Sequence, residues 1–257
     1  MKNCSNELLF AAAAIISCSV AEAYDIGQLK QLSLEDLANT QVVTASNRST
    51  RLGETAAAAF VITAEDIRRS GAANLPDVLR LVPGVNVARI SASEWAISIR
   101  GFNDQFSNKL QVLVDGRNVY TPLFSGVFWD EQSVLMQDID RIEVIRGPGG
   151  ATWGANAVNG VINIITKQSR ATLGSMVSTA AGTRQYELAG RIGFAAGDNT
   201  YGRVYAKGFY QHHFADNPVG LDDSNLKGGL FGFRTDTITQ DASAMFAGHF
   251  FKENIEN

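Results

Sequence analysis

The sequence is poor in the residues that build disulfides, metal sites and thiol active sites. It has two cysteines, Cys4 and Cys18, both within the first 18 residues. The rest of the chain therefore has no thiolate cluster and no disulfide framework. Of its three histidines, His212 and His213 are neighbours in a predicted strand and point to opposite faces. His249 has no acidic partner at a ligand spacing, so we expect no metal site and no cofactor.

The chain also lacks an excess of positive charge. It has 22 Lys and Arg against 26 Asp and Glu, which gives a formal net charge of −4. Proteins that bind nucleic acid usually carry a basic face. We therefore expect no nucleic-acid partner.

Catalytic motifs are missing as well. No Gly-x-Ser-x-Gly elbow occurs. Gly149 and Gly154 have the spacing of a nucleotide-binding loop, but Ala155 and Asn156 stand where that loop requires Lys and Ser or Thr. The spacing therefore indicates a tight structural turn, with Trp153 as its packing anchor.

One acidic cluster is the remaining candidate for a catalytic site. Asp138, Asp140 and Glu143 could supply paired carboxylates for an exported hydrolase. Because Arg141 alternates with them at a strand edge, a solvated or ion-paired face is the simpler interpretation. We expect that the protein is not an enzyme.

No apolar run is long enough for a transmembrane helix, and the longest apolar run of the chain lies near the N-terminus. Lys2 precedes an apolar run from Leu8 to Ile16, and Ala21-Glu22-Ala23 follows it. That layout predicts a secretory signal peptide over residues 1–23, which leaves Tyr24 as the first residue. The run is too short to span a bilayer as a helix. Lipidation at Cys18 is an alternative, although the residues before it form a poor lipobox.

The central motif of the chain runs from Ile139 to Lys167. A strand that alternates in polarity is followed by the glycine-rich stretch Gly147-Pro148-Gly149-Gly150, and then by an apolar strand, Val161 to Ile165. Together with three earlier stretches, this motif resembles the plug domain of TonB-dependent outer-membrane receptors. The earlier stretches are Ile67 to Val85, Ile97-Ser-Ile-Arg-Gly-Phe102 and Val112-Leu-Val-Asp-Gly-Arg117.

Local signals predict a small α+β domain with short helices and a small mixed sheet. Thr63, Asp66 and Gly71 mark the ends of one helix. Asn74 and Pro83 bound a second helix, from about Leu75 to Val82. Short strands are expected at residues 84–89, 96–100, 111–114 and 118–120, with an Asp-Gly turn before the last.

After Thr172 the pattern changes to long alternating segments. The clearest are residues 185–195, 200–212 and 241–251, and weaker ones lie at 172–181 and 227–236. Segments of about ten residues with one apolar face are typical of a transmembrane β-barrel wall, although a soluble sandwich gives a similar pattern. The signal peptide and the plug resemblance favour the barrel. The short Gly197-Asp198-Asn199 connection is expected on the periplasmic side, and the long connection after His213 on the outer side.

The resemblance implies an energy-coupling segment. Thr40-Gln41-Val42-Val43-Thr44-Ala45 resembles a TonB box, the sequence through which these receptors engage TonB. A β-branched stretch in a tether can add as a strand to a partner's sheet edge. The alternative is an ordinary short strand or linker.

The resemblance also implies contacts inside the barrel and with a ligand. Arg100 and Arg146 are candidates for contacts between plug and barrel, the alternative being exposed arginines at strand ends. The candidates for ligand-facing positions lie in two plug loops. They are Ser93, Trp95, Tyr120, Phe124 and Trp129.

We therefore expect four parts, which are a signal peptide (1–23), a linker with the TonB box (24–52), a plug (53–168) and the start of a β-barrel (169–257). The expected function is TonB-driven uptake of a ferric siderophore or cobalamin across the outer membrane, whose lipid the barrel would contact. Family barrels have about 22 strands of some ten residues. Five strands cannot close, so we expect a fragment of a longer receptor. The alternative is a secreted plug-like binding module without transport activity.

Overall fold

The computed structural model describes residues 41–42, 50–51, 58–132, 134–212, 225–239 and 241–256. The expected signal peptide, both cysteines and most of the linker lie outside these residues, as do Thr40 and residues 43–45 of the TonB-box prediction. The two main sheets belong to one compact unit, which spans residues 38–257. No described helix is long and apolar enough to cross a membrane.

The first part of the chain is an α+β domain around a five-stranded mixed sheet in the order β3-β8-β9-β6-β7. Strands β6 and β9 are parallel, and the other neighbours are antiparallel. A separate hairpin pairs β4 with β5. The strands of this domain are β3 (Ala58–Thr63), β4 (Val85–Arg89), β5 (Trp95–Ile99), β6 (Leu110–Val114), β7 (Arg117–Asn118), β8 (Ile139–Arg146) and β9 (Gly160–Thr166). This confirms the predicted α+β class.

Helix α2 (Ala64–Ser70) has the ends that the sequence predicts. The Asp66 backbone N–H donates to Thr63 Oγ1 at 3.2 Å, the Thr63 N–H donates to Asp66 Oδ2 at 2.9 Å, and Gly71 ends the helix with φ of 64°. Helix α3 (Leu75–Leu79) begins as predicted at the Asn74 cap. It ends three residues before the predicted Val82, because its last turn tightens to i→i−3 bonds. Short helical turns complete the domain, namely η3 (Met136–Asp138), α4 (Gly150–Trp153) and η4 (Ser169–Thr172).

Two apolar clusters lie on the two faces of this sheet. The larger cluster packs α2 and α3 against buried side chains such as Ile142 and Ile164, and it includes Trp95 and Trp129. The smaller cluster lies around Ile145 and Val161. Its members are Val42, Leu113, Ile145, Ala157 and Val161, with Trp153 packed beside them. Burial on both faces fits the nearly continuous apolar runs of β8 and β9.

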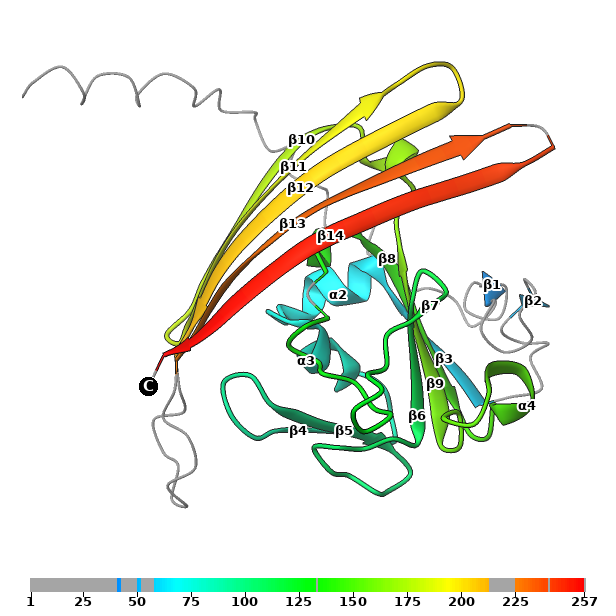
Figure 1. Ribbon diagram of the computed structural model, residues 1–257, viewed down its shortest axis with the longest axis vertical. Coiled ribbons are helices and arrows are strands. Elements are labelled where there is room, and N and C mark those ends of the chain that lie inside the picture. The colour runs from blue at the N-terminus through cyan, green and yellow to red at the C-terminus, as the bar shows by residue number, and fades with distance from the viewer. Residues whose placement is uncertain are drawn as a thin grey trace, which may run out of the picture. The chain divides into compact units, whose positions relative to one another are not determined.

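Five long antiparallel strands form the second sheet, which we call the wall sheet (Figure 1). They pair in sequence order, each with the next along the chain. The strands are β10 (Gly174–Ala181), β11 (Gln185–Ala195), β12 (Thr200–Gln211), β13 (Asn225–Ile238) and β14 (Ser243–Glu256). The bounds of β11 match the prediction, whereas β13 and β14 are longer than predicted. Residues Ser169–Thr172 form η4, so β10 starts after the predicted Thr172.

The wall sheet has an apolar outer face and a polar inner face. Large apolar side chains alternate along the outer face of β11 and β14, where Leu188, Ile192, Phe246 and Phe250 are 59–70% exposed. Arg203, which lies on the opposite face of β12, is 3% exposed. A transmembrane barrel wall shows this alternation. The described strands form an open sheet that does not close into a barrel.

Candidate functional site

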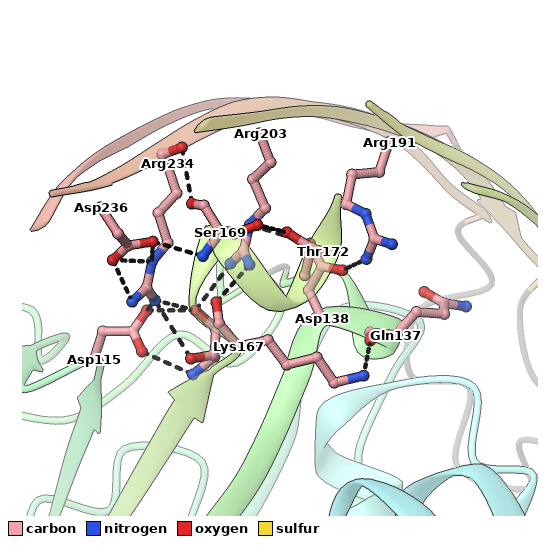
Figure 2. Close-up of polar contacts among 11 residues, drawn as sticks. Asp115, Gln137, Asp138, Lys167, Ser169, Thr172, Arg191, Arg203, Arg234 and Asp236 are labelled. Atoms are coloured by element: carbon pink, nitrogen blue, oxygen red, sulfur yellow. Dashed lines mark hydrogen bonds and ion pairs between the residues drawn. The ribbon is translucent and has the colours of Figure 1, made fainter. Parts of the chain in front are cut away.

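The polar side of the wall sheet contacts the α+β domain through a cluster of charged side chains (Figure 2). The wall supplies arginines from three neighbouring strands. The α+β domain supplies groups at one end of its sheet, from the turns after β6 and β9 and from η3. Figure 2 shows the cluster members Asp115, Gln137, Asp138, Lys167, Ser169, Thr172, Arg191, Arg203, Arg234 and Asp236.

Arg234 is the most extensively bonded of the wall arginines. Its Nη2 donates to Asp236 Oδ1 at 2.9 Å, and its Nε donates to the same carboxylate. Residues i and i+2 of a strand share a face, which places this pair side by side. Across the interface, Nη1 donates to Thr166 Oγ1 at 2.7 Å and lies 3.2 Å from Asp115 Oδ2. Arg234 thus joins a carboxylate of the wall to one of the α+β domain.

The Thr166 hydroxyl is the shared acceptor at the centre of the cluster. It accepts hydrogen bonds from Arg234 and, at 3.1 Å, from Arg203 Nη2. Its own proton goes to Asp115 Oδ2 at 2.8 Å, and the Thr166 backbone N–H donates to Asp115 Oδ1 at 2.7 Å. Asp115 starts the predicted Asp-Gly turn and has φ of 49°. The turn therefore holds this carboxylate against the end of β9.

Asp138 is a second buried carboxylate and lies in η3. It is 2% exposed, and two wall arginines approach it. Arg191 Nη1 donates to its Oδ1, and Arg203 Nε lies 3.3 Å from its Oδ2. Arg203 also donates through Nη1 to the Lys167 carbonyl at 2.5 Å. Buried charges are tolerated when they are paired and hydrogen-bonded in this way.

The connection between the two sheets is itself fixed to the wall. In η4, the Ser169 backbone N–H donates to Asp236 Oδ2 at 2.7 Å, and its hydroxyl donates to the Arg234 carbonyl at 3.2 Å. Further along the interface, Gln137 Nε2 donates to Ser178 Oγ of β10 at 2.7 Å. The contacts therefore extend over β10 to β13, and they are polar and non-covalent.

A second contact region lies near the other end of the wall strands. A small cavity there is lined by Trp95 and Trp129 of the α+β domain and by Gln211 and Leu226 of the wall. In the β4–β5 hairpin, Arg89 Nε donates to the Ser91 carbonyl at 2.9 Å, and its guanidinium lies over the Trp95 ring. Burial lowers the pKa of Arg89, and this effect is opposed by Asp77.

The predicted ligand-facing residues differ in exposure. Ser93, Trp95 and Trp129 are buried, whereas Tyr120 is exposed. Phe124 lies in an edge-to-face row, with Phe106 and Phe128 at ring distances of 5.1 and 5.0 Å. The structure thus brings Trp95 and Trp129 together in one cluster and places Phe124 in an aromatic row. Two exposed apolar side chains were not among our predicted residues, namely Leu123 in the second of these loops and Phe102 in the loop between β5 and β6.

Arg100 and Arg146 lie at the end of the sheet away from the cluster in Figure 2. Arg146 Nη1 donates to the Pro83 carbonyl at 3.0 Å, and its Nε donates to the Ala58 carbonyl. Arg100 has φ of 58°, and its guanidinium lies beside Gly147. These contacts are all within the α+β domain. A contact of either arginine with a more complete wall stays a prediction.

Two residues of the predicted TonB box are described, and they form a strand. Gln41 and Val42 make up β1, which pairs antiparallel with β2 (Thr50–Arg51). The Val42 side chain is fully buried in the smaller apolar cluster. The predicted acidic cluster is partly an ion-paired face, since Arg141 pairs with Asp140 at 2.8 Å and with Glu143 at 2.9 Å. Its third member, Asp138, binds the wall instead.

Sequence reasoning missed the residues that join the two sheets. The alternation of residues 185–195 and 200–212 puts Arg191, Arg203 and Lys207 on the polar face of their strands, but it indicates no partner for them. The available signal was their charge, because a cation on the inner face of a wall needs a carboxylate close by. Asp115 was seen only as a turn residue and Asp138 only as a member of an acidic cluster.

Comparisons with known proteins agree with this architecture. The family model described as the TonB-dependent Receptor Plug Domain matches residues 51–161. The vitamin B12 transporter BtuB of Vibrio vulnificus is 34% identical over 215 residues, which cover 82% of this chain and 34% of that protein. The ferric enterobactin receptor of Pseudomonas aeruginosa is 33% identical over 188 residues, covering 68% of this chain and 24% of the receptor. The chain thus spans about a third or less of the length of these relatives.

Solved structures show the same fold. The ferric-catecholate import receptor Fiu of E. coli aligns with a TM-score of 0.63 and 26% identity, over 84% of this chain and 30% of that one. The ferripyoverdine receptor of P. aeruginosa aligns with a TM-score of 0.64 and 21% identity, over 83% of this chain and 27% of that one. Because both alignments cover more than four fifths of this chain, they include strands of the wall sheet in addition to the α+β domain.

Proposed function

Because the chain belongs to the TonB-dependent receptors, we propose that it serves in the active uptake of a cobalamin or a ferric siderophore across the outer membrane. The observation that carries this proposal is the joint match of the plug and the wall, which extends over 82% of the chain at 34% identity to a vitamin B12 transporter. The ferric enterobactin receptor, at 33% identity, supports the siderophore alternative. The comparisons give no support to a secreted module without transport activity.

In this proposal the α+β domain is the plug of an outer-membrane barrel. The apolar outer face of the wall sheet suits contact with lipid, because its large side chains would otherwise face water. The charged cluster on the inner face is held to the plug by ion pairs and hydrogen bonds. Such contacts can be broken and formed again without breaking a covalent bond, as the opening and closing of a gate requires.

The handle for energy coupling is the segment from Thr40 to Ala45. Its residues Gln41 and Val42 already adopt a strand in β1. An extended segment can add to the edge of a partner's sheet and transmit a pulling force through backbone hydrogen bonds. TonB is the partner that the family implies for this segment.

The ligand side of the plug consists of the loops that carry our five predicted residues. Tyr120 and Leu123 in one of these loops offer exposed apolar surface, as does Phe102 in the loop after β5. Such surface suits the flat organic parts of a large chelate. The buried residues Ser93, Trp95 and Trp129 would fix the conformation of these loops and would not contact the ligand themselves.

The test is uptake in cells that lack their own receptors for these ligands. The gene's complete product is expressed, and radiolabelled cobalamin and ferric enterobactin are offered separately. We expect energy-dependent accumulation of one of them. If neither accumulates although the receptor is present in the outer membrane, the proposal is wrong in its ligand class.

A variant of the handle tests the coupling step. Val42→Pro removes the backbone N–H that strand addition needs. We expect binding at the cell surface to persist while accumulation falls to the level of cells without TonB. Gln31→Pro, which lies outside the hexapeptide, is the matched control and should accumulate ligand normally. Equal loss in both variants would argue against the assignment of the handle.

A further inference from the structure

Two arginines of the wall sheet form a like-charge pair. Arg203 of β12 and Arg234 of β13 are direct partners in the strand register, and both are buried, at 3% and 8% exposure. Like charges directly opposite one another destabilise a sheet. In this structure the plug offsets that cost, since Asp138 and Asp115 lie 3.3 and 3.2 Å from the two guanidinium groups.

A cavity with several charged side chains in its lining adjoins this pair. Its volume is about 280 Å³, and it lies between the β6–β7 turn and the inner side of β14. Arg117 is a third arginine on its boundary, beside Arg203 and Arg234. The other charged or titratable groups on the boundary are Asp115, Glu131, Asp138, Tyr205 and His249. The cavity is large enough for a phosphate or a carboxylate group.

The two plug carboxylates are the parts that the proposed function requires to move. Asp115 and Asp138 both belong to the plug, whereas both arginines belong to the wall. If the plug shifts, Arg203 loses the carboxylate that it contacts, and Arg234 keeps only Asp236. Cations that are partly removed from water and have no counter-charge are costly. An anion in the adjacent cavity would restore the balance.

We propose that this cavity is a transient binding site for an anionic oxygen group of the transported ligand, a phosphate or a carboxylate, which takes the place of Asp115 and Asp138. This inference rests on the proposed function. The pair lies near the Ala196–Asn199 and Thr239–Ala242 turns of the wall, away from the long connection between β12 and β13. The site would therefore act late in passage, after the ligand has left the outer loops.

Thermal unfolding of the full chain in detergent tests the site. Asp138→Asn and Asp115→Asn each remove one competing carboxylate. Sodium phosphate and sodium acetate are compared with sodium chloride at equal ionic strength. We expect phosphate or acetate to raise the Tm of these variants by about 3–6 °C at roughly ten times its Kd, and to leave the wild-type Tm at its value in chloride.

Two further variants make the result decisive. Asp140→Asn is the matched control, because Asp140 pairs with Arg141 on the surface and lies outside the cavity. It should respond like the wild type. Adding Arg203→Gln to Asp138→Asn should abolish the phosphate response.

The outcome is independent of transport. If neither anion stabilises either aspartate variant beyond chloride, or if the response survives Arg203→Gln, the site is rejected and the uptake assay still decides the proposed function. Should Asp138→Asn fail to fold, Asp115→Asn carries the test. Arg234 keeps Asp236 in that variant, which favours folding, but it loses Asp115, so adding Arg234→Gln should abolish the anion response.

Discussion

Thr166 and Asp115 are 51 residues apart in the sequence, and two hydrogen bonds join them at the end of the plug sheet. The Thr166 hydroxyl donates to the carboxylate and accepts from two wall arginines at once. One side chain thus orders both partners of the interface. Its loss should therefore be felt by the plug and the wall together.

Thr166→Val keeps the shape of the side chain and removes the hydroxyl. We expect the free energy of unfolding to fall by about 1–3 kcal/mol, because two buried donors and one acceptor lose their partner. Denaturant unfolding followed by circular dichroism measures the loss. Thr179→Val, at an exposed position of β10, is the control and should change stability little. Equal effects in both variants would contradict the central role of the hydroxyl.

Asp138 should be energetically coupled to Arg203. Asp138→Asn alone leaves the buried Arg203 and the partly buried Arg191 without their carboxylate, and we expect a loss of about 3–5 kcal/mol. In the double variant with Arg203→Gln, part of that loss should be recovered. A double-mutant cycle on the free energy of unfolding gives the coupling, and a coupling of zero would mean that the 3.3 Å contact contributes nothing.

Gly160 is needed where β9 begins. A Cβ added there would lie 2.5 Å from the Ile145 carbonyl oxygen and 2.7 Å from Ile99 Cδ1. We expect Gly160→Ala to cost about 1–3 kcal/mol by overpacking. In Gly208→Ala, a Cβ meets nothing within 4 Å, so this variant serves as the control. The unfolding midpoints of both variants are compared with that of the wild type, and an equal shift in both would contradict overpacking at Gly160.

Two glutamates of the plug should give opposite pH dependence. Burial, followed by the nearby Asp130, raises the pKa of Glu131 above its usual 4.5. The stability that this raised pKa contributes is present below pH 4.5 and is lost as the pH rises through the folded-state value. Glu131→Gln should therefore have a higher Tm than the wild type near pH 7 and an equal Tm in acid.

Glu65 provides the opposite case. Hydrogen bonds from Arg68 and Arg69 lower its pKa. The stabilisation is present above the usual pKa and disappears as the pH falls through the lowered one. Glu65→Gln should lower the Tm near pH 7 and leave it unchanged in acid. The same sign of change in the two glutamine variants near pH 7 would contradict both assignments.

Local sequence signals were enough to predict much of the fold. The cap residues Thr63 and Asn74 defined the starts of two helices, and strict alternation defined β11 and β12. These features depend on neighbours in the chain, so they are visible in a single sequence. The end of α3 was placed too late because its last turn changes its hydrogen-bonding pattern, which apolar spacing does not reveal.

The interface could not be predicted in the same way. Asp115 meets Arg234 across 119 residues, and Thr166 meets Arg203 across 37. Such pairs depend on how the two sheets are brought together. The alternation of β12 placed Arg203 inside, but nothing local indicates which carboxylate it meets. Arg100 and Arg146 were chosen as contacts because each follows an apolar strand, a signal that does not specify the direction of the side chain.

The three tryptophans of the chain divide between the two apolar clusters of the plug. Trp95 and Trp129 belong to the large one, and Trp153 packs beside the small one that buries Val42. Residues 169–257 contain no tryptophan, so the tryptophan emission of this chain comes from the plug. Replacing Trp95 and Trp129 by Phe would leave Trp153, beside the cluster that buries Val42 of the proposed handle, as the one tryptophan of this sequence. Its emission spectrum would then follow the departure of Val42 from the small cluster in real time.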